Sequence, residues 1–282
     1  MNRTRPGWRI LVTAILAIVA VYFLVPVYWL VIASTKSTGE LLGTSPLWFT
    51  GDPHLWSNLT RLFAYNDHIY LRWIGNTVLY SGVGALAATL LAAAAGYAMA
   101  KFEFRGRETV FNIVLGGVLV PATVLALPLY LMFSSSGLTD TYWSVLLPSV
   151  VSPFGVYLCR IYCEASVPDD LLEAARVDGA GELRIFFTVV LRIITPALVT
   201  VFLFQLIGIW NNYFLPLVML SDPDLYPLPL GLMSWMSITD RVPVLYQLTV
   251  AGSLVSVIPL AIAIVVLQRF WRTGLTAGSV KA

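Results

Sequence analysis

EAARVDG, residues 173–179, is a charged, helix-forming stretch that lies between long apolar parts of the chain. A helix that crosses a bilayer needs about 20 mainly apolar residues. On both sides of the stretch, long intervals contain no Asp, Glu, Lys or Arg, and we predict one transmembrane helix for each. These charge-free intervals are residues 10–35, 73–100, 109–139, 141–159, 193–221 and 242–268. The stretch itself is then expected in a loop on the water side of the membrane.

The composition supports a membrane protein. Hydrophobic residues make up 58% of the 282 residues and charged residues only 11%, which excludes an ordinary soluble domain. We predict an all-α polytopic membrane protein that forms a single domain over residues 1–282. The predicted transmembrane spans are about residues 10–33, 74–99, 109–133, 142–162, 194–220 and 248–270, and the predicted cytoplasmic loop is about residues 164–192.

The basic residues predict the orientation. If the N-terminus is cytoplasmic, only four of the seventeen Lys and Arg residues lie outside, namely Lys36, Arg61, Arg72 and Arg241. Cytoplasmic loops carry an excess of Lys and Arg, so both termini are predicted to face the cytoplasm. The first apolar run is longer than the core of a signal peptide and contains Pro26, so we expect it to remain attached as a transmembrane helix.

No enzyme chemistry is indicated. The sequence has no GxSxG, HExxH or GxxxxGK[ST] pattern, so ATP that drives any transport must be hydrolysed by another subunit. Cys159 and Cys163 are predicted on the opposite membrane side from His54 and His68, which leaves too few ligands for a metal site. We therefore predict no catalytic residue, no metal and no cofactor.

A few polar residues within the spans suggest a path for an uncharged solute. Trp210, Asn211 and Asn212, together with Gln205, lie in the fifth predicted span. Aromatic faces and amides can bind a sugar, but such amides also join helices to each other, and both interpretations stay open. Proton- or sodium-coupled carriers often place an ionisable group within a span. The charge-free intervals contain none, which argues against such a carrier.

The loop at residues 164–192 is predicted to be a helix, a turn and a return helix. Ser166 and Asp169 resemble a capping box, with Pro168 in the first turn. One face would hold Leu171, Ala174, Ala175 and Asp178, and Gly179 would end the helix. The plain alternative is a surface helix in which Glu173 pairs with Arg176, an interaction of about 0.2–0.5 kcal/mol.

The return helix is predicted from a second apolar pattern. Ile185, Phe186, Val189 and Ile193 would form its buried face.

The loop also carries the signature of a known family. Its pattern is EAA, three residues, then G, and the chain matches it at Glu173, Ala174, Ala175 and Gly179, with the frequent DGA form at Asp178, Gly179 and Ala180. The chain therefore resembles the integral-membrane permeases of binding-protein-dependent, ATP-driven importers. Further matches make it similar to the carbohydrate subgroup, in particular to the G-type half of the maltose permease: STK at 34–36, GNT at 75–77, GL at 137–138, WN at 210–211 and GLTAG at 274–278. It departs at Leu191-Arg192, where the family usually has Leu-Pro.

The resemblance implies a type I importer permease fold in a prokaryotic inner membrane. It implies as partners a second permease subunit in a heterodimer, an ATPase dimer at the cytoplasmic face, an external solute-binding protein and the lipid bilayer, and no nucleic acid. Sugar or oligosaccharide import is the expected function. The residues expected to couple to the ATPase are Pro168, Asp169, Leu172, Glu173, Ala174, Ala175, Asp178, Gly179 and Ala180, and a contact from the C-terminal tail is expected at Gly274, Thr276 and Gly278.

Three alternatives remain at this point. The first is a channel or secondary carrier for a small solute, whose uptake would survive the loss of ATP and of any binding protein. The second is a non-transporting membrane scaffold, with which the polar external segment 36–72 is compatible. The third is an importer of the same kind whose substrate is a phosphorylated polyol.

Overall fold

The structure is a computed structural model that describes residues 6–277, with side chains described for residues 7–268. The described chain is helical and contains no β-strand. It divides into two compact units. Unit 1 consists of residues 1–70 and 232–257, and unit 2 consists of residues 71–231 and 258–282.

Unit 1 contains the first long helix and a small helical cap that follows it. Its elements are α1 (Pro6–Ser34), α2 (Thr38–Gly43), α3 (Leu55–Ala64), the start of α4 (Ile69–Lys101), the end of α14 (Leu228–Met236) and the first part of α15 (Val244–Ala277). Tyr70 is fully buried in this unit, and its hydroxyl donates to the carbonyl of Gly252 at 2.7 Å. The ring of Trp235 stacks on Tyr70 with 6.4 Å between centroids. This contact joins α4 to α14 and α15 within the unit.

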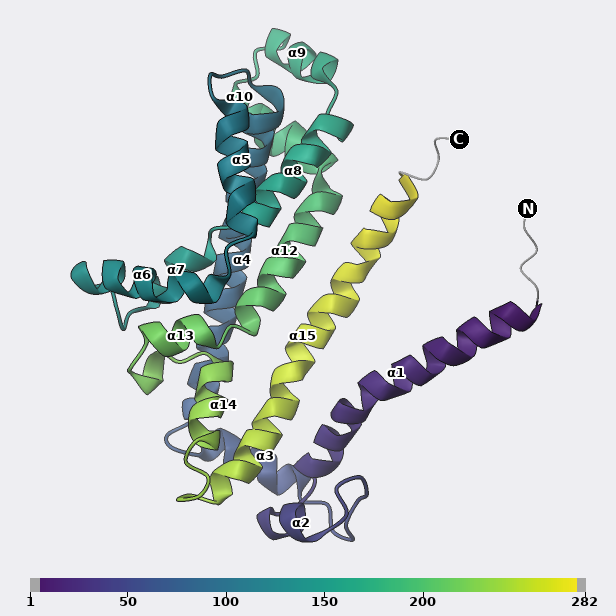
Figure 1. The fold of residues 1–282 in the computed structure, drawn as a ribbon, viewed down its shortest axis with the longest axis vertical. Coiled ribbons are helices and arrows are strands. Elements are labelled where there is room, and N and C mark those ends of the chain that lie inside the picture. The colour runs from purple at the N-terminus through teal and green to yellow at the C-terminus, as the bar shows by residue number, and fades with distance from the viewer. Residues whose placement is uncertain (1–5, 278–282) are drawn as a thin grey trace. The chain divides into compact units, whose positions relative to one another are not determined.

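Unit 2 contains the remaining helices. These are most of α4, α5 (Arg107–Val118), α6 (Ala122–Ser135), α7 (Tyr142–Ser149), α8 (Pro153–Ser166), α9 (Asp169–Val177), α10 (Glu182–Ile185), the π-helix η1 (Phe186–Val190), α11 (Leu191–Ile193), α12 (Thr195–Trp210), α13 (Phe214–Met219), the 3₁₀-helix η2 (Pro223–Leu225), the start of α14 and the end of α15. α4, α8 and α12 run along the unit, and α9 lies at one end of it (Figure 1).

Glycines allow α4 and α8 to approach closely. A Cβ atom on Gly96 of α4 would lie 2.7 Å from the backbone nitrogen of Arg160 and 2.7 Å from the Cβ of Cys159. On α8, a Cβ atom on Gly155 would lie 2.9 Å from the Cβ of Ala92. Small residues on membrane helices permit such backbone contact. The two cysteines, Cys159 and Cys163, are free and buried beside this contact.

Within the part of the chain that the structure describes, four helical stretches are long and apolar enough to cross a membrane: residues Gly7–Ser34, Ile69–Lys101, Tyr142–Ser166 and Val244–Gln268. The number reaches six if each of two bent helix pairs is one span. Within the predicted span 109–133, α5 and α6 meet at 105°, and the bend lies at Pro121, whose backbone is extended. Proline lacks an N–H and restricts the residue before it, so a straight helix is not continued there.

Candidate functional site

The loop between α8 and α12 begins differently from the prediction. The capping box at Ser166 and Asp169 is wrong, because Ser166 is the last residue of α8 and α9 starts at Asp169 without a side-chain cap. Pro168 precedes α9 with an extended backbone instead of lying in its first turn. The buried Val167 holds the chain between the two helices, and its N–H bonds to the carbonyl of Cys163. Because the residue before a proline avoids the α conformation, α8 ends just before this point.

α9 presents a different face to the protein than predicted. Leu172 is 1% exposed and packs with Ala175 against the core formed by α4, α8 and the return helix. Leu171 and Ala174, predicted on one face with Ala175, are exposed. Residues 172 and 175 therefore form the buried face of α9. The exposed face contains Glu173 and Ala174, and Val177 on it is 87% exposed.

The turn after α9 agrees with the predicted role of Gly179. Its φ angle is +80°, a left-handed conformation. The N–H of Gly179 bonds to the carbonyl of Arg176, and the N–H of Ala180 bonds to the carbonyl of Ala175, both at 3.0 Å. These two bonds form a Schellman motif, in which glycine is the residue best suited to the left-handed position.

Two ion pairs involve α9, one with the end of α4 and one with the start of α10. Lys101, at the end of α4, contacts Asp169 with 2.8 Å between Nζ and Oδ1. Arg176 contacts Glu182 with 2.7 Å between Nε and Oε1, and Glu182 also accepts from the hydroxyl of Tyr97 at 3.3 Å. The alternative pairing of Arg176 with Glu173 is therefore not the one formed. Glu173 is exposed and makes no ion pair with any side chain that the structure describes.

The return helix buries two of the four residues predicted for its apolar face, Ile185 and Phe186, but not the other two. Residues 186–190 form a π-helix, which places one additional residue in the turn. As a result, Val190 and Ile194 are fully buried beside Ile185, whereas the predicted Val189 and Ile193 are only partly buried. Arg192, which stands where the resembled family usually has proline, is exposed in α11.

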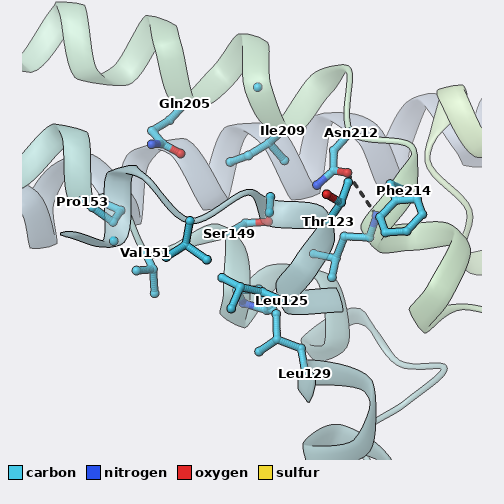
Figure 2. Close-up of a pocket in the computed structure, with 16 residues that line it drawn as sticks. Thr123, Leu125, Leu129, Ser149, Val151, Pro153, Gln205, Ile209, Asn212 and Phe214 are labelled. Carbon is cyan, nitrogen blue, oxygen red and sulfur yellow. Dashed lines mark hydrogen bonds between the residues drawn. The ribbon is translucent and has the colours of Figure 1, made fainter. Parts of the chain in front are cut away.

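A pocket of about 360 Å³ lies in unit 2, where three helices are interrupted (Figure 2). We call it the central pocket. The interruptions separate α5 from α6, α7 from α8, and α12 from α13. Its lining contains no charged residue and consists of Gly117, Val120, Ala122, Thr123, Leu125, Leu129, Pro148, Ser149, Val151, Pro153, Gln205, Gly208, Ile209, Asn212, Phe214 and Leu215. Cavities of this kind, mainly apolar with a few polar groups, are typical of small-molecule sites.

The central pocket contains two of the four residues predicted for a solute path. Gln205 and Asn212 line it, whereas Trp210 is buried elsewhere and Asn211 is exposed, with its amide bonded to the carbonyl of Ile207 at 2.9 Å. Gln205 donates to the hydroxyl of Ser152 at 2.5 Å. The side-chain oxygen of Asn212 accepts from the N–H of Leu215 at 3.3 Å.

The sequence did not single out Thr123 and Ser149, which supply further hydroxyl groups to the central pocket (Figure 2). The prolines near the helix interruptions were the available signal. In the C-terminal tail, Gly274 and Thr276 lie within the helical backbone of α15. Gly278 lies outside the described residues.

Comparison with known proteins gives consistent similarities. Residues 88–273 match the family described as "Binding-protein-dependent transport system inner membrane component". The chain is 32% identical to the arabinooligosaccharides transport system permease protein AraQ of Halalkalibacterium halodurans, over 99% of each chain. It is 31% identical to the diacetylchitobiose uptake system permease protein NgcG of Streptomyces coelicolor, over 91% of this chain and 83% of the relative.

A solved structure has a similar fold. It is a chain of a bacterial ABC transporter involved in the import of the acidic polysaccharide alginate. The TM-score is 0.83 at 24% sequence identity, over 96% of this chain and 99% of that chain.

Proposed function

This chain belongs to the family of binding-protein-dependent transport system inner membrane components, and from this membership we propose that it forms half of the translocation path for a sugar or oligosaccharide. The family identifies it as a membrane-embedded permease of an ABC importer, in which a separate subunit hydrolyses ATP. That membership argues against the earlier alternatives of a secondary carrier and a membrane scaffold. The chain acts with a second permease, an ATPase and a solute-binding protein, as is typical of the family.

The proposed substrate class rests on one observation of the site. The central pocket combines hydroxyl and amide groups with apolar walls and has no charged residue in its lining. An uncharged polyol can pair with such groups without leaving a charge buried, whereas a phosphorylated one would carry its charge into an apolar site at a large cost. The relatives named above transport arabinooligosaccharides and diacetylchitobiose according to their names, which supports a neutral oligosaccharide.

For coupling, we propose that the outer face of α9 binds the ATPase. Leu172 and Ala175 pack α9 against the core formed by α4, α8 and the return helix, and Lys101 pairs with Asp169, the first residue of α9. Glu173 and Ala174 remain exposed on the opposite side. In this proposal, Gly179 sets the turn that fixes the direction of the return helix. The proposal takes this side of the membrane as cytoplasmic, as the basic residues predict.

Reconstitution of the importer tests the substrate proposal. The chain would be purified with its partner permease, ATPase and binding protein and placed in proteoliposomes. We expect uptake of labelled neutral oligosaccharide that requires both ATP and the binding protein, because the chain itself has no phosphate-binding loop. Competition by unlabelled neutral sugars, but not by phosphorylated polyols, is the expected pattern. The reverse pattern of competition would overturn the substrate class.

Gln205→Leu is expected to lower the uptake rate about 5- to 30-fold, since it removes the amide from the central pocket and one lost polar contact is worth roughly 1–2 kcal/mol. The measurement is initial uptake at several substrate concentrations, normalised to the amount of chain in the membrane. Asn211→Leu is the matched control, because Asn211 lies close by in sequence but outside the pocket lining. Equal losses in both variants would contradict a path through this pocket.

A further inference from the structure

The segment 44–50 of unit 1 folds back along α1. The hydroxyl of Tyr28 in α1 donates to the carbonyl of Leu47 at 3.2 Å (Figure 1 shows α1 and α2). Tyr28 lies six residues before Ser34, the end of α1, which corresponds to roughly 9 Å along a helix at 1.5 Å per residue. The segment therefore does not continue away from the end of α1 but returns beside its last turns.

This return brings the segment to the expected depth of the membrane boundary. The charge-free part of α1 begins at Ile10, directly after Arg9. Tyr28 follows Ile10 by about 27 Å of helix, while the hydrocarbon core of a bilayer is about 30 Å thick. At this level of α1, apolar side chains are exposed, including those of Val25 and Val27. Leu47, held beside Tyr28, is thus expected where hydrocarbon meets the lipid headgroups.

The side chains of the segment suit such a position. Leu47, Trp48 and Phe49 are 48%, 70% and 51% exposed, respectively. Residues 41–51 contain no Asp, Glu, Lys or Arg. Tryptophan and tyrosine are enriched at membrane interfaces because their rings are largely apolar and carry one polar group.

Hydrogen bonds fix the start of the segment. The ammonium group of Lys36, whose residue is 1% exposed, donates to the hydroxyl of Thr44 at 2.9 Å and to the carbonyl of Ser45 at 2.5 Å. The preceding α2 is held by a capping box between Ser37 and Glu40. The bonds from Ser37 also lower the pKa of the Glu40 carboxyl. The exposed apolar side chains are therefore presented by an ordered segment.

We propose that residues 44–50 form an interfacial anchor, which inserts Leu47, Trp48 and Phe49 into the lipid surface next to the C-terminal end of α1. The occupant of this apolar face is lipid, because the segment is held at the depth of an exposed apolar helix and carries no charge that would select a protein partner. The anchor fixes the level of the α2–α3 cap relative to the membrane. This inference depends on α1 crossing the membrane and not on the identity of the substrate.

Spin-label accessibility tests the anchor. In the assembled importer in lipid nanodiscs, with Cys159→Ala and Cys163→Ala as background, a nitroxide would be attached at Trp48→Cys or Phe49→Cys. The measured quantity is the ratio of collisions with oxygen, which enters lipid, to collisions with a water-soluble nickel complex. This oxygen-to-nickel ratio is expected to be severalfold higher at position 48 or 49 than at the control position. The matched control is Asp52→Cys, an exposed charged position in the same loop.

Tyr28→Phe provides a second measurement, because it removes only the hydrogen bond to Leu47. It is expected to reduce the oxygen-to-nickel ratio at position 48 and to leave position 52 unchanged. Nickel accessibility at positions 48 and 49 equal to that at 52 would overturn the proposal. So would protection from nickel that arises only when the solute-binding protein is added, since the face would then be a protein docking surface. ATPase activity of the unlabelled background variant in the nanodiscs verifies that the importer is intact, so that this result stays separate from the test of substrate class.

Discussion

Replacing Gly179 with valine is expected to uncouple ATP hydrolysis from transport while the chain remains folded in the membrane. Gly179 has a φ angle of +80° and closes the Schellman motif after α9. A non-glycine residue in this conformation costs about 1–2 kcal/mol, and a β-branched residue costs more. The native turn would therefore be populated at least about 5- to 30-fold less. Since a Cβ atom at this position meets nothing within 4 Å, the loss arises from the backbone and not from a clash in the core.

The measurement is ATP-dependent uptake together with ATPase activity of the reconstituted importer, at equal amounts of chain. Uptake is expected to fall at least about tenfold with Gly179→Val, as 1.4 kcal/mol corresponds to a factor of ten. Gly179→Asn is the matched control and is expected to retain most of the uptake, because asparagine tolerates the left-handed conformation. Full uptake with valine would show that coupling does not depend on this turn. Equal losses with valine and asparagine would instead indicate that the absence of a side chain, and not the φ angle, is what matters.

Gly96→Ala is expected to destabilise the whole of unit 2. The added methyl group would lie 2.7 Å from the backbone nitrogen of Arg160 and 2.7 Å from the Cβ of Cys159. Real Cβ atoms do not approach other atoms so closely, so α4 and α8 must separate. Overpacking of this kind costs about 1–3 kcal/mol. If the helices move apart, part of the packing between α4 and α8 is lost as well.

Gly82→Ala on the same helix is the control, because a Cβ atom there meets nothing within 4 Å. Both variants gain the same helix propensity, about 1 kcal/mol, so their difference isolates the packing. Thermal denaturation in detergent, followed by the fraction of monodisperse protein, is expected to show a lower midpoint for Gly96→Ala only. Equal midpoints for the two variants would be incompatible with the close contact of α4 and α8.

The sequence was a good guide wherever a local property decides the outcome. Long apolar intervals predict helices for a lipid environment, since backbone groups must be paired inside the segment, and the described chain is helical. The left-handed turn at Gly179 is also a local property. The EAA pattern and its spacing predicted the family, which the comparisons confirm.

The tertiary structure alone decided which side chains face which neighbour. On α9, Leu171 and Leu172 have the same hydrophobicity, yet only Leu172 meets the core. The π-helix shifts burial from Val189 to Val190 because the turn contains one more residue. Neither choice is encoded in a local propensity, because both depend on the position of α4 and α8 behind the loop.

The same applies to the central pocket. Asn211 and Asn212 are identical in chemistry, but only Asn212 lines the pocket, because α12 ends at Trp210 and the two asparagines lie in the turn that leads to α13. Thus the sequence by itself determined the helices, the solvent they face and the turn after α9, which follow from apolar length and backbone preference. Only the tertiary structure decided which residues of α9 and of the return helix are buried and which residues line the pocket, because these depend on where distant helices break and meet.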